Sequence, residues 1–151
     1  MTAPDEPDRS ARSGEPPETA AMRRALALAA SAQAPLGPNP RVGCVLLAPD
    51  GTVVAEGYHA GAGTPHAELV ALTRAGERAR GATAVVTLEP CAHTGRTGPC
   101  ADALLAAAIR RVVVAQPDTS RAAHGGADRL RAGGVDVQLG LLADEAAALN
   151  P

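Results

Sequence analysis

Hydrophobic and polar positions vary along this chain with two periods, one typical of helices and one of strands. Helical spacing predicts a helix over about 19–33, which ends at "APLGPNP" because prolines cannot continue it. Two β-rich runs follow in "RVGCVLLAPDGTVVAEGYH", and the turn residues Pro49-Asp50-Gly51 between them predict a hairpin. The first part of the fold is therefore a helix followed by two strands.

From residue 66 onward, helical and strand patterns alternate. Helices are predicted for "HAELVALTRAGERA", "CADALLAAAIR", "GADRLRAGG" and "LADEAAALN". Strands are predicted between them for "ATAVVTLEP", "RVVVAQ" and "VDVQLG". Strands that alternate with helices form a sheet with helices packed on both faces. The pattern therefore predicts an α/β fold.

The first 18 residues differ in composition from the rest of the chain. They are rich in Pro, Asp and Glu and contain almost nothing to bury, so we predict a disordered tail over 1–18 and one domain over 19–151.

The arginine pair and apolar run of "MRRALALAASAQA" also have the shape of a secretory signal. The run starts at Met22 behind the polar tail and is mostly alanine, which favours an amphipathic helix. No segment has the ~20 apolar residues of a membrane span, so we expect no membrane partner.

The amino-acid composition restricts which residues can form the core and which partners the protein can bind. The chain has no Phe or Trp and one Tyr, so the core must be built from Ala, Val and Leu. A net charge of −2 and the lack of aromatic stacking platforms make a nucleic-acid partner unlikely. Three cysteines, an odd number, do not suggest a disulfide framework and instead favour a reducing, cytoplasmic location.

Three residues with metal-binding side chains occupy equivalent places in the predicted fold. His66, Cys91 and Cys100 each lie where a loop or strand end meets the start of a helix, and such positions gather at one edge of an α/β sheet. One histidine and two cysteines are good ligands for Zn²⁺. Structural zinc normally has four protein ligands, whereas catalytic zinc has three and binds water at the fourth position. The sequence therefore predicts an open, catalytic zinc site.

Glu68 lies two positions after His66 and can reach the same pocket from the first turn of its helix. Zinc lowers the pKa of bound water, and a nearby carboxylate can then move the protons, so we predict Glu68 as the general base. Taken singly, these features have ordinary explanations, because His-x-Glu is often solvated surface and paired cysteines can be core residues. We interpret Cys44 as a buried thiol and His124 as an exposed residue without a role.

The His-x-Glu motif followed by Pro-Cys and a second Cys resembles the signature of zinc-dependent base deaminases. The longer loop "AHTGRTGP" between the cysteines, with "PNPRVGCV", "GYHAGAGTPHAE" and "TLEPCAHTGRTGPC", resembles the deaminases of riboflavin biosynthesis. That resemblance extends from about Met22 to Asn150. It implies a three-layer α/β/α sandwich with a central mixed five-stranded sheet, a zinc ion held by His66, Cys91 and Cys100, and a homo-oligomer, either a dimer or a tetramer.

The resemblance also implies a set of substrate contacts. They fall on Asn39, His59, His93, Arg96, Thr97 and Asp118. Pro38 and Pro40 hold Asn39 extended, and its amide can pair with a pyrimidine edge, although a turn asparagine is the simpler interpretation. Arg96 could clamp a phosphate or be an ordinary loop arginine, and His59 could bind substrate or cap a strand end.

The sequence departs from the family in two places. Where relatives have Asp-Pro-Asn-Pro, this chain has Asp118-Thr119-Ser120-Arg121, which affects the expected substrate more than the reaction. Many relatives continue into a reductase domain, whereas this sequence ends at Pro151, so either a separate reductase or a truncated form of a two-domain protein is implied. We therefore expect hydrolytic deamination of the phosphoribosylamino-pyrimidine of riboflavin biosynthesis. The alternatives are the same reaction on another base, nucleoside or nucleotide, and a binding module with structural zinc.

Overall fold

A five-stranded mixed sheet lies at the centre of the molecule, with strand order β2-β1-β3-β4-β5. The computed structural model describes residues 15–31, 41–59, 65–91, 100–117 and 125–149. Strands β1 and β2 form an antiparallel hairpin, β3 pairs antiparallel to β1, and β3, β4 and β5 run parallel. The strands are β1 (Gly43–Leu47), β2 (Val53–Tyr58), β3 (Thr83–Leu88), β4 (Arg111–Gln116) and β5 (Asp136–Leu139). This arrangement confirms the predicted mixed sheet and hairpin.

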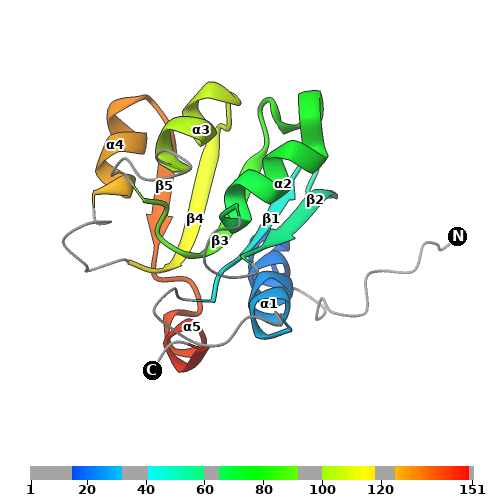
Figure 1. Cartoon of the computed structure of the whole chain (residues 1–151), viewed down its shortest axis with the longest axis vertical. Helices are drawn as coiled ribbons and strands as arrows, with labels where there is room; N and C mark the ends of the chain where they lie inside the picture. The colour runs from blue at the N-terminus through cyan, green and yellow to red at the C-terminus, as the bar shows by residue number, and fades with distance from the viewer. Residues whose placement is uncertain (1–14, 32–40, 60–64, 92–99, 118–124, 150–151) are drawn as a thin grey trace, which may run out of the picture.

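Helices cover both faces of this sheet, as the alternating pattern predicted (Figure 1). Helices α2 (Ala67–Ala75), α3 (Cys100–Ala106) and α4 (Gly126–Ala132) pack on one face, which we call the site face. Helices α1 (Pro17–Ala30) and α5 (Ala143–Leu149) pack on the opposite face, which we call the back face. The result is the expected three-layer α/β/α sandwich. None of the described helices is long and apolar enough to cross a membrane.

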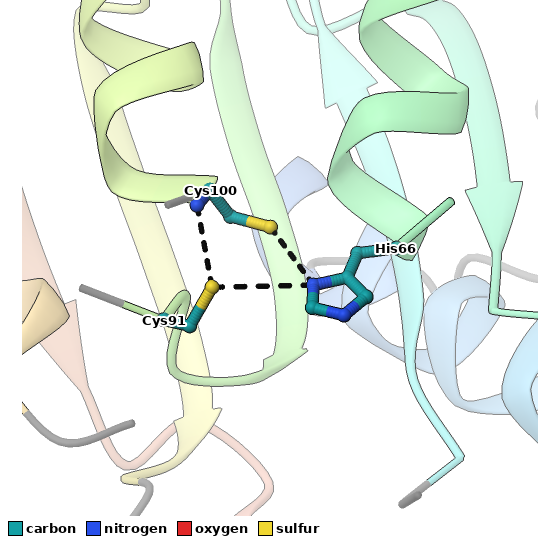
Figure 2. A group of neighbouring side chains, drawn as sticks. All are labelled: His66, Cys91 and Cys100. Atoms are coloured by element: carbon teal, nitrogen blue, oxygen red, sulfur yellow. Dashed lines mark hydrogen bonds between the residues drawn. The ribbon is translucent and has the colours of Figure 1, made fainter. Parts of the chain in front are cut away.

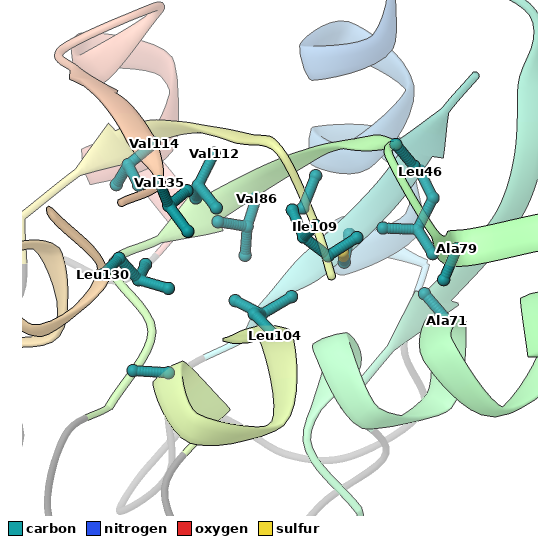
Figure 3. Packing of buried hydrophobic residues seen from close by; sticks show 14 of the residues in the cluster. Leu46, Ala71, Ala79, Val86, Leu104, Ile109, Val112, Val114, Leu130 and Val135 are labelled. Carbon is teal, nitrogen blue, oxygen red and sulfur yellow. The ribbon is translucent and has the colours of Figure 1, made fainter. Parts of the chain in front are cut away.

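Successive residues of the central strands contribute to opposite faces, because side chains alternate along a strand. In β4, Val112 and Val114 join the hydrophobic cluster under the site face, while Val113 joins the cluster under the back face. Figure 3 shows the site-face cluster, in which Leu104 of α3 and Leu130 of α4 pack against the sheet. A strand buried on both faces has to be apolar, which explains the continuous run "VVVA" over 112–115. The aliphatic core predicted from the composition is confirmed.

Several helix ends differ from the predicted ones for local reasons. Helix α1 begins at Pro17 rather than at 19, because proline is favourable at the first helical position. Helix α3 ends at Ala106 rather than near residue 110, and Ala108 adopts a left-handed conformation with φ of 63°. Helix α2 ends at Ala75 and passes into a short 3-10 turn, η1 (Gly76–Ala79). The Pro-rich segment over 32–40 lies outside the described residues.

Candidate metal centre

His66 is the residue immediately before α2, at the edge of the sheet. Its backbone is extended, with φ of −67° and ψ of 160°, as expected for the residue that precedes a helix. The preceding Pro65 is bound by the buried His59 at the end of β2, whose Nδ1 lies 3.1 Å from the Pro65 carbonyl oxygen. A carbonyl oxygen can only accept, so His59 Nδ1 carries the proton of this bond. The β2 end thereby fixes the entry into α2 and the position of His66.

Cys91 and Cys100 are brought together by the end of β3 and the start of α3. The Cys100 backbone N–H donates to Cys91 Sγ at 3.3 Å, and the Ala101 N–H donates to the Cys91 carbonyl oxygen at 3.1 Å. Both thiols are free and buried. The hydrogen bond from the Cys100 side chain, together with those from His66 and the Cys100 backbone, lowers the pKa of Cys91 to about 4. Cys91 therefore ionises more readily than Cys100, whose pKa the same contact raises.

The three donor atoms converge from three separate segments, as Figure 2 shows. His66 Nδ1 lies 3.1 Å from Cys100 Sγ and 4.0 Å from Cys91 Sγ, and all three ligand atoms lie within 4.8 Å of one another. In a tetrahedral site with Zn–S near 2.3 Å and Zn–N near 2.0 Å, neighbouring ligand atoms lie about 3.5–3.8 Å apart. The observed separations bracket this value. One imidazole nitrogen and two sulfurs, spaced in this way, fit a zinc ion.

Among the described residues, no fourth His, Cys, Asp or Glu joins this group. His59 lies beside it, with its ring edge-on to that of His66 and the ring centroids 5.2 Å apart, but it bonds to Pro65. Three protein donors are the number typical of a catalytic zinc site, which keeps one coordination position for water or substrate.

Glu68 is placed against this cluster in the first turn of α2. Its side chain is buried, with 4% of its surface exposed, although carboxyl groups are normally on the surface. Burial raises the pKa of Glu68 to about 7, while nearby His66 and a hydrogen bond with the Cys100 side chain act in the opposite direction. A carboxyl group with a pKa near neutrality can both accept and return a proton. The arrangement thus combines a three-donor metal cluster with a buried group able to transfer protons.

Comparison with known proteins gives the same interpretation of these residues. The family "Cytidine and deoxycytidylate deaminase zinc-binding region" matches residues 16–116, which include His66, Glu68 and Cys91 as well as Cys100. The chain belongs to this family. Its zinc-binding character agrees with the His66, Cys91 and Cys100 cluster, so the predicted cofactor and the predicted resemblance are both confirmed.

Several proteins whose names refer to riboflavin biosynthesis or to pyrimidine deamination are similar over most of the chain. The riboflavin biosynthesis protein RibD of Escherichia coli is 54% identical over 130 residues, covering 85% of this chain and 35% of that protein. A diaminohydroxyphosphoribosylamino-pyrimidine deaminase of Buchnera aphidicola is 44% identical, covering 85% of this chain and 88% of that protein. The crystal structure of a Thermotoga maritima diaminohydroxyphosphoribosylaminopyrimidine deaminase/5-amino-6-(5-phosphoribosylamino)uracil reductase has 38% identity and a TM-score of 0.83, covering 89% of this chain and 39% of that one.

These coverages differ in one important respect. The chain spans about a third of the length of RibD from E. coli, but most of the length of the Buchnera deaminase. The similarity to the longer proteins therefore concerns one part of them.

The predicted substrate contacts are described only in part. His59 is buried beside His66, at the edge of the metal cluster. The remaining predicted contacts lie outside the described residues: Asn39, His93, Arg96, Thr97 and Asp118. Cys44 is fully buried in the site-face core, as predicted, and desolvation raises the pKa of its thiol. His124 lies outside the described residues.

One buried polar residue at this edge was not predicted from the sequence. Glu89 follows β3 directly, has 8% of its surface exposed, and accepts a hydrogen bond from the backbone N–H of Ala127 at 2.8 Å. The available signal was an acidic residue between a buried strand and a metal ligand, where a solvated side chain is not expected.

Proposed function

We propose that this chain catalyses zinc-dependent hydrolytic deamination of an aminopyrimidine, namely the phosphoribosylamino-pyrimidine intermediate of riboflavin biosynthesis, with release of ammonia. The observation that carries the proposal is the buried carboxyl group of Glu68 beside a three-donor metal cluster. The similarity in length and sequence to the Buchnera deaminase, whose name states this substrate, supports the choice of pyrimidine.

The chain's own residues supply two parts of the reaction. His66, Cys91 and Cys100 would hold the zinc ion, which when bound supplies a Lewis acid that lowers the pKa of water. Glu68 takes one proton from the attacking water and delivers it to the ring nitrogen. It then takes the remaining proton from the hydroxyl group now on the ring carbon and delivers it to the departing amine. Water and the amino-substituted ring carbon are thereby converted to a carbonyl group and ammonia. Because burial places the pKa of Glu68 at about 7, the same carboxyl group can act first as base and then as acid.

Further substrate contacts belong to this proposal. His59 lies beside the cluster, with its ring edge-on to that of His66, and is proposed as a substrate contact. The contacts at the remaining positions follow from the family resemblance: Asn39, His93, Arg96, Thr97 and Asp118.

An ammonia-release assay tests the proposal directly. We expect the zinc-loaded protein to release ammonia from the riboflavin-pathway pyrimidine and to act poorly on cytidine, deoxycytidylate and the dephosphorylated pyrimidine. Failure to release ammonia from any aminopyrimidine, with zinc bound, would contradict the proposed reaction.

A second candidate is the same reaction on a different base, nucleoside or nucleotide. Asp118-Thr119-Ser120-Arg121 replaces the Asp-Pro-Asn-Pro of relatives, so the part of the chain expected to hold the sugar phosphate is altered. The same substrate panel separates the two candidates, since a preference for an unphosphorylated compound would favour the second.

Partners and location complete the proposal. The Thermotoga relative is named as both deaminase and reductase, and we propose that a reductase acts on the product of this chain. We also propose a homo-oligomer, to be checked by light scattering, and a cytoplasmic location, which is consistent with free cysteines.

A further inference from the structure

The first turn of α4 is capped by a residue from another part of the chain. The residue before this helix is Gly125, which has φ of 100° and no side chain with which to cap. The carboxyl group of Glu89, located at the end of β3, accepts the Ala127 N–H at 2.8 Å instead. A carboxylate that accepts a backbone N–H at a helix start is a charge-assisted bond, about twice as strong as a neutral one. Both partners are buried, so no water can replace the carboxylate without rearrangement.

Close packing at Gly126 strengthens the same contact. A Cβ atom added at Gly126 would lie 1.7 Å from the carbonyl oxygen of Pro90 and 2.8 Å from its carbonyl carbon. Only glycine therefore allows α4 to approach Pro90 so closely. The backbone of Glu89 is also fixed, because its N–H donates to the carbonyl oxygen of Gln116 at the end of β4, at 2.9 Å.

These contacts fix the first two residues of a three-residue segment, and its third residue, Cys91, belongs to the metal cluster. We call Glu89-Pro90-Cys91 the ligand segment. Cys91 is bound to the start of α3 through its sulfur and its carbonyl oxygen, while Glu89 and Pro90 are bound to the start of α4. The ligand segment thus lies between the two helices. If α4 moved away from Glu89, only the backbone bond of Glu89 to β4 and the α3 contacts of Cys91 would fix Cys91 relative to His66.

We propose that Glu89 is a positioning residue for the metal site: by capping α4 from the end of β3, its carboxylate holds Cys91 where it can share a metal ion with His66 and Cys100. The inference rests on the proposed function only in that these three residues bind a metal. Glu89 itself supplies no ligand atom to the cluster.

The metal affinity of Glu89→Ala is the direct test. Alanine leaves the Ala127 N–H without this carboxylate acceptor. Groups that hydrogen-bond a metal ligand directly are worth about 10–100-fold in metal affinity, and because Glu89 acts through the backbone, a loss of about 10-fold is expected. We expect that loss for zinc, measured by competition with a chromophoric chelator. We also expect an altered thiolate-to-metal absorption band in the cobalt-substituted protein. Neither readout depends on the substrate or on turnover.

Two matched variants separate positioning from general damage. Asp102→Ala removes a different carboxylate contact between α3 and α4, the exposed ion pair of Asp102 with Arg129, and should leave the zinc affinity and cobalt spectrum unchanged. Glu89→Gln retains an acceptor oxygen but loses the charge, so its zinc affinity should fall by about 3-fold or more, and by less than that of Glu89→Ala.

Each outcome decides the proposal. The proposal is supported if Glu89→Ala binds zinc more weakly and has an altered cobalt spectrum. Glu89→Gln should then have a zinc affinity between those of Glu89→Ala and the wild type. Wild-type affinity and spectrum in Glu89→Ala overturn it, as does an equal loss in Asp102→Ala. If Glu89→Ala does not fold, Glu89→Gln decides by the same criteria. If the wild-type protein binds neither zinc nor cobalt, the proposed function fails as well. If the wild type binds metal and Glu89→Ala binds it equally well, only the positioning role is refuted.

Discussion

The site face and the back face of the sheet share the same strands, but they bury different chemistry. On the site face lie the buried carboxyl groups of Glu68 and Glu89, and all three cysteines are on this side. The buried residues of the back face are apolar or carry a hydroxyl group, and they include Met22, Val113 and Thr87.

Charged residues described near the back face form ion pairs and are partly exposed, as for Arg111, with 19% of its side chain exposed. Arg111 Nε contacts a Glu18 carboxylate oxygen at 2.7 Å, and Arg24 Nε contacts Glu56 at 2.7 Å. Partly exposed pairs of this kind contribute about 0–1 kcal/mol each. Burying a carboxyl group is costly, so the buried carboxyl groups of Glu68 and Glu89 close to the metal cluster indicate a role in function. The comparison therefore predicts that site-face polar substitutions impair activity and back-face substitutions impair stability.

The largest expected effect is that of Glu68→Gln on turnover. Glutamine keeps the shape of the side chain but cannot transfer protons, and general acid–base catalysis is worth about 10²–10⁴-fold. We expect kcat to fall by at least that factor while zinc remains bound at the wild-type stoichiometry. Ammonia release and metal analysis on the same sample measure both. Turnover within a few-fold of wild type would remove Glu68 from the mechanism.

Met22→Ala is the corresponding change on the back face. Met22 is fully buried between α1 and the sheet, and removing a buried methionine side chain costs about 2–5 kcal/mol. We expect the free energy of unfolding to fall by that amount in urea denaturation, with zinc affinity and kcat unchanged under conditions in which the protein is folded. A loss of zinc affinity comparable with that of Glu89→Ala would mean that the two faces are not independent.

Most of the fold could be predicted because the relevant signals are local. The apolar run in "RVVVAQ" and the turn at Pro49-Asp50-Gly51 depend on neighbouring residues, and both elements were found where expected. The convergence of His66, Cys91 and Cys100 was also predictable, since parallel strands end at one edge of a sheet. General rules of chain topology thus sufficed to identify the metal centre.

What could not be predicted depends on contacts between distant segments. Nothing near Glu89 indicates that its carboxylate caps a helix 38 positions later, or that Gly126 lacks a side chain because Pro90 occupies that space. The early end of α3 is similar: "LLAAAI" has good helix formers throughout, yet the chain turns at Ala108 to enter β4. Tertiary packing, rather than local propensity, decided these three features.

The smallest effect that we expect to distinguish the site face from the back face is a pH dependence of the stability of the metal-free protein. A solvent-exposed glutamate has an ordinary pKa of 4.5, and burial raises the pKa of Glu68 to about 7 in the folded chain. Between these values the folded state holds a proton that the unfolded state has lost, so stability falls as the pH rises from about 4.5 through 7. The penalty reaches about 3 kcal/mol above pH 7, since one pKa unit corresponds to about 1.4 kcal/mol.

Glu68→Gln abolishes this penalty because glutamine does not ionise. We expect the metal-free variant to gain stability relative to the metal-free wild type as the pH rises from 4 to 8, by up to about 3 kcal/mol in urea denaturation with chelator present. Glu68 also raises the pKa of His66, so the difference between the two proteins includes this coupling. Met22→Ala serves as the control, because it should lower the stability by a similar amount at every pH. If the difference in unfolding free energy between Glu68→Gln and wild type does not change with pH, the pKa of Glu68 is not raised in the folded protein. That result would also weaken the contrast between the two faces.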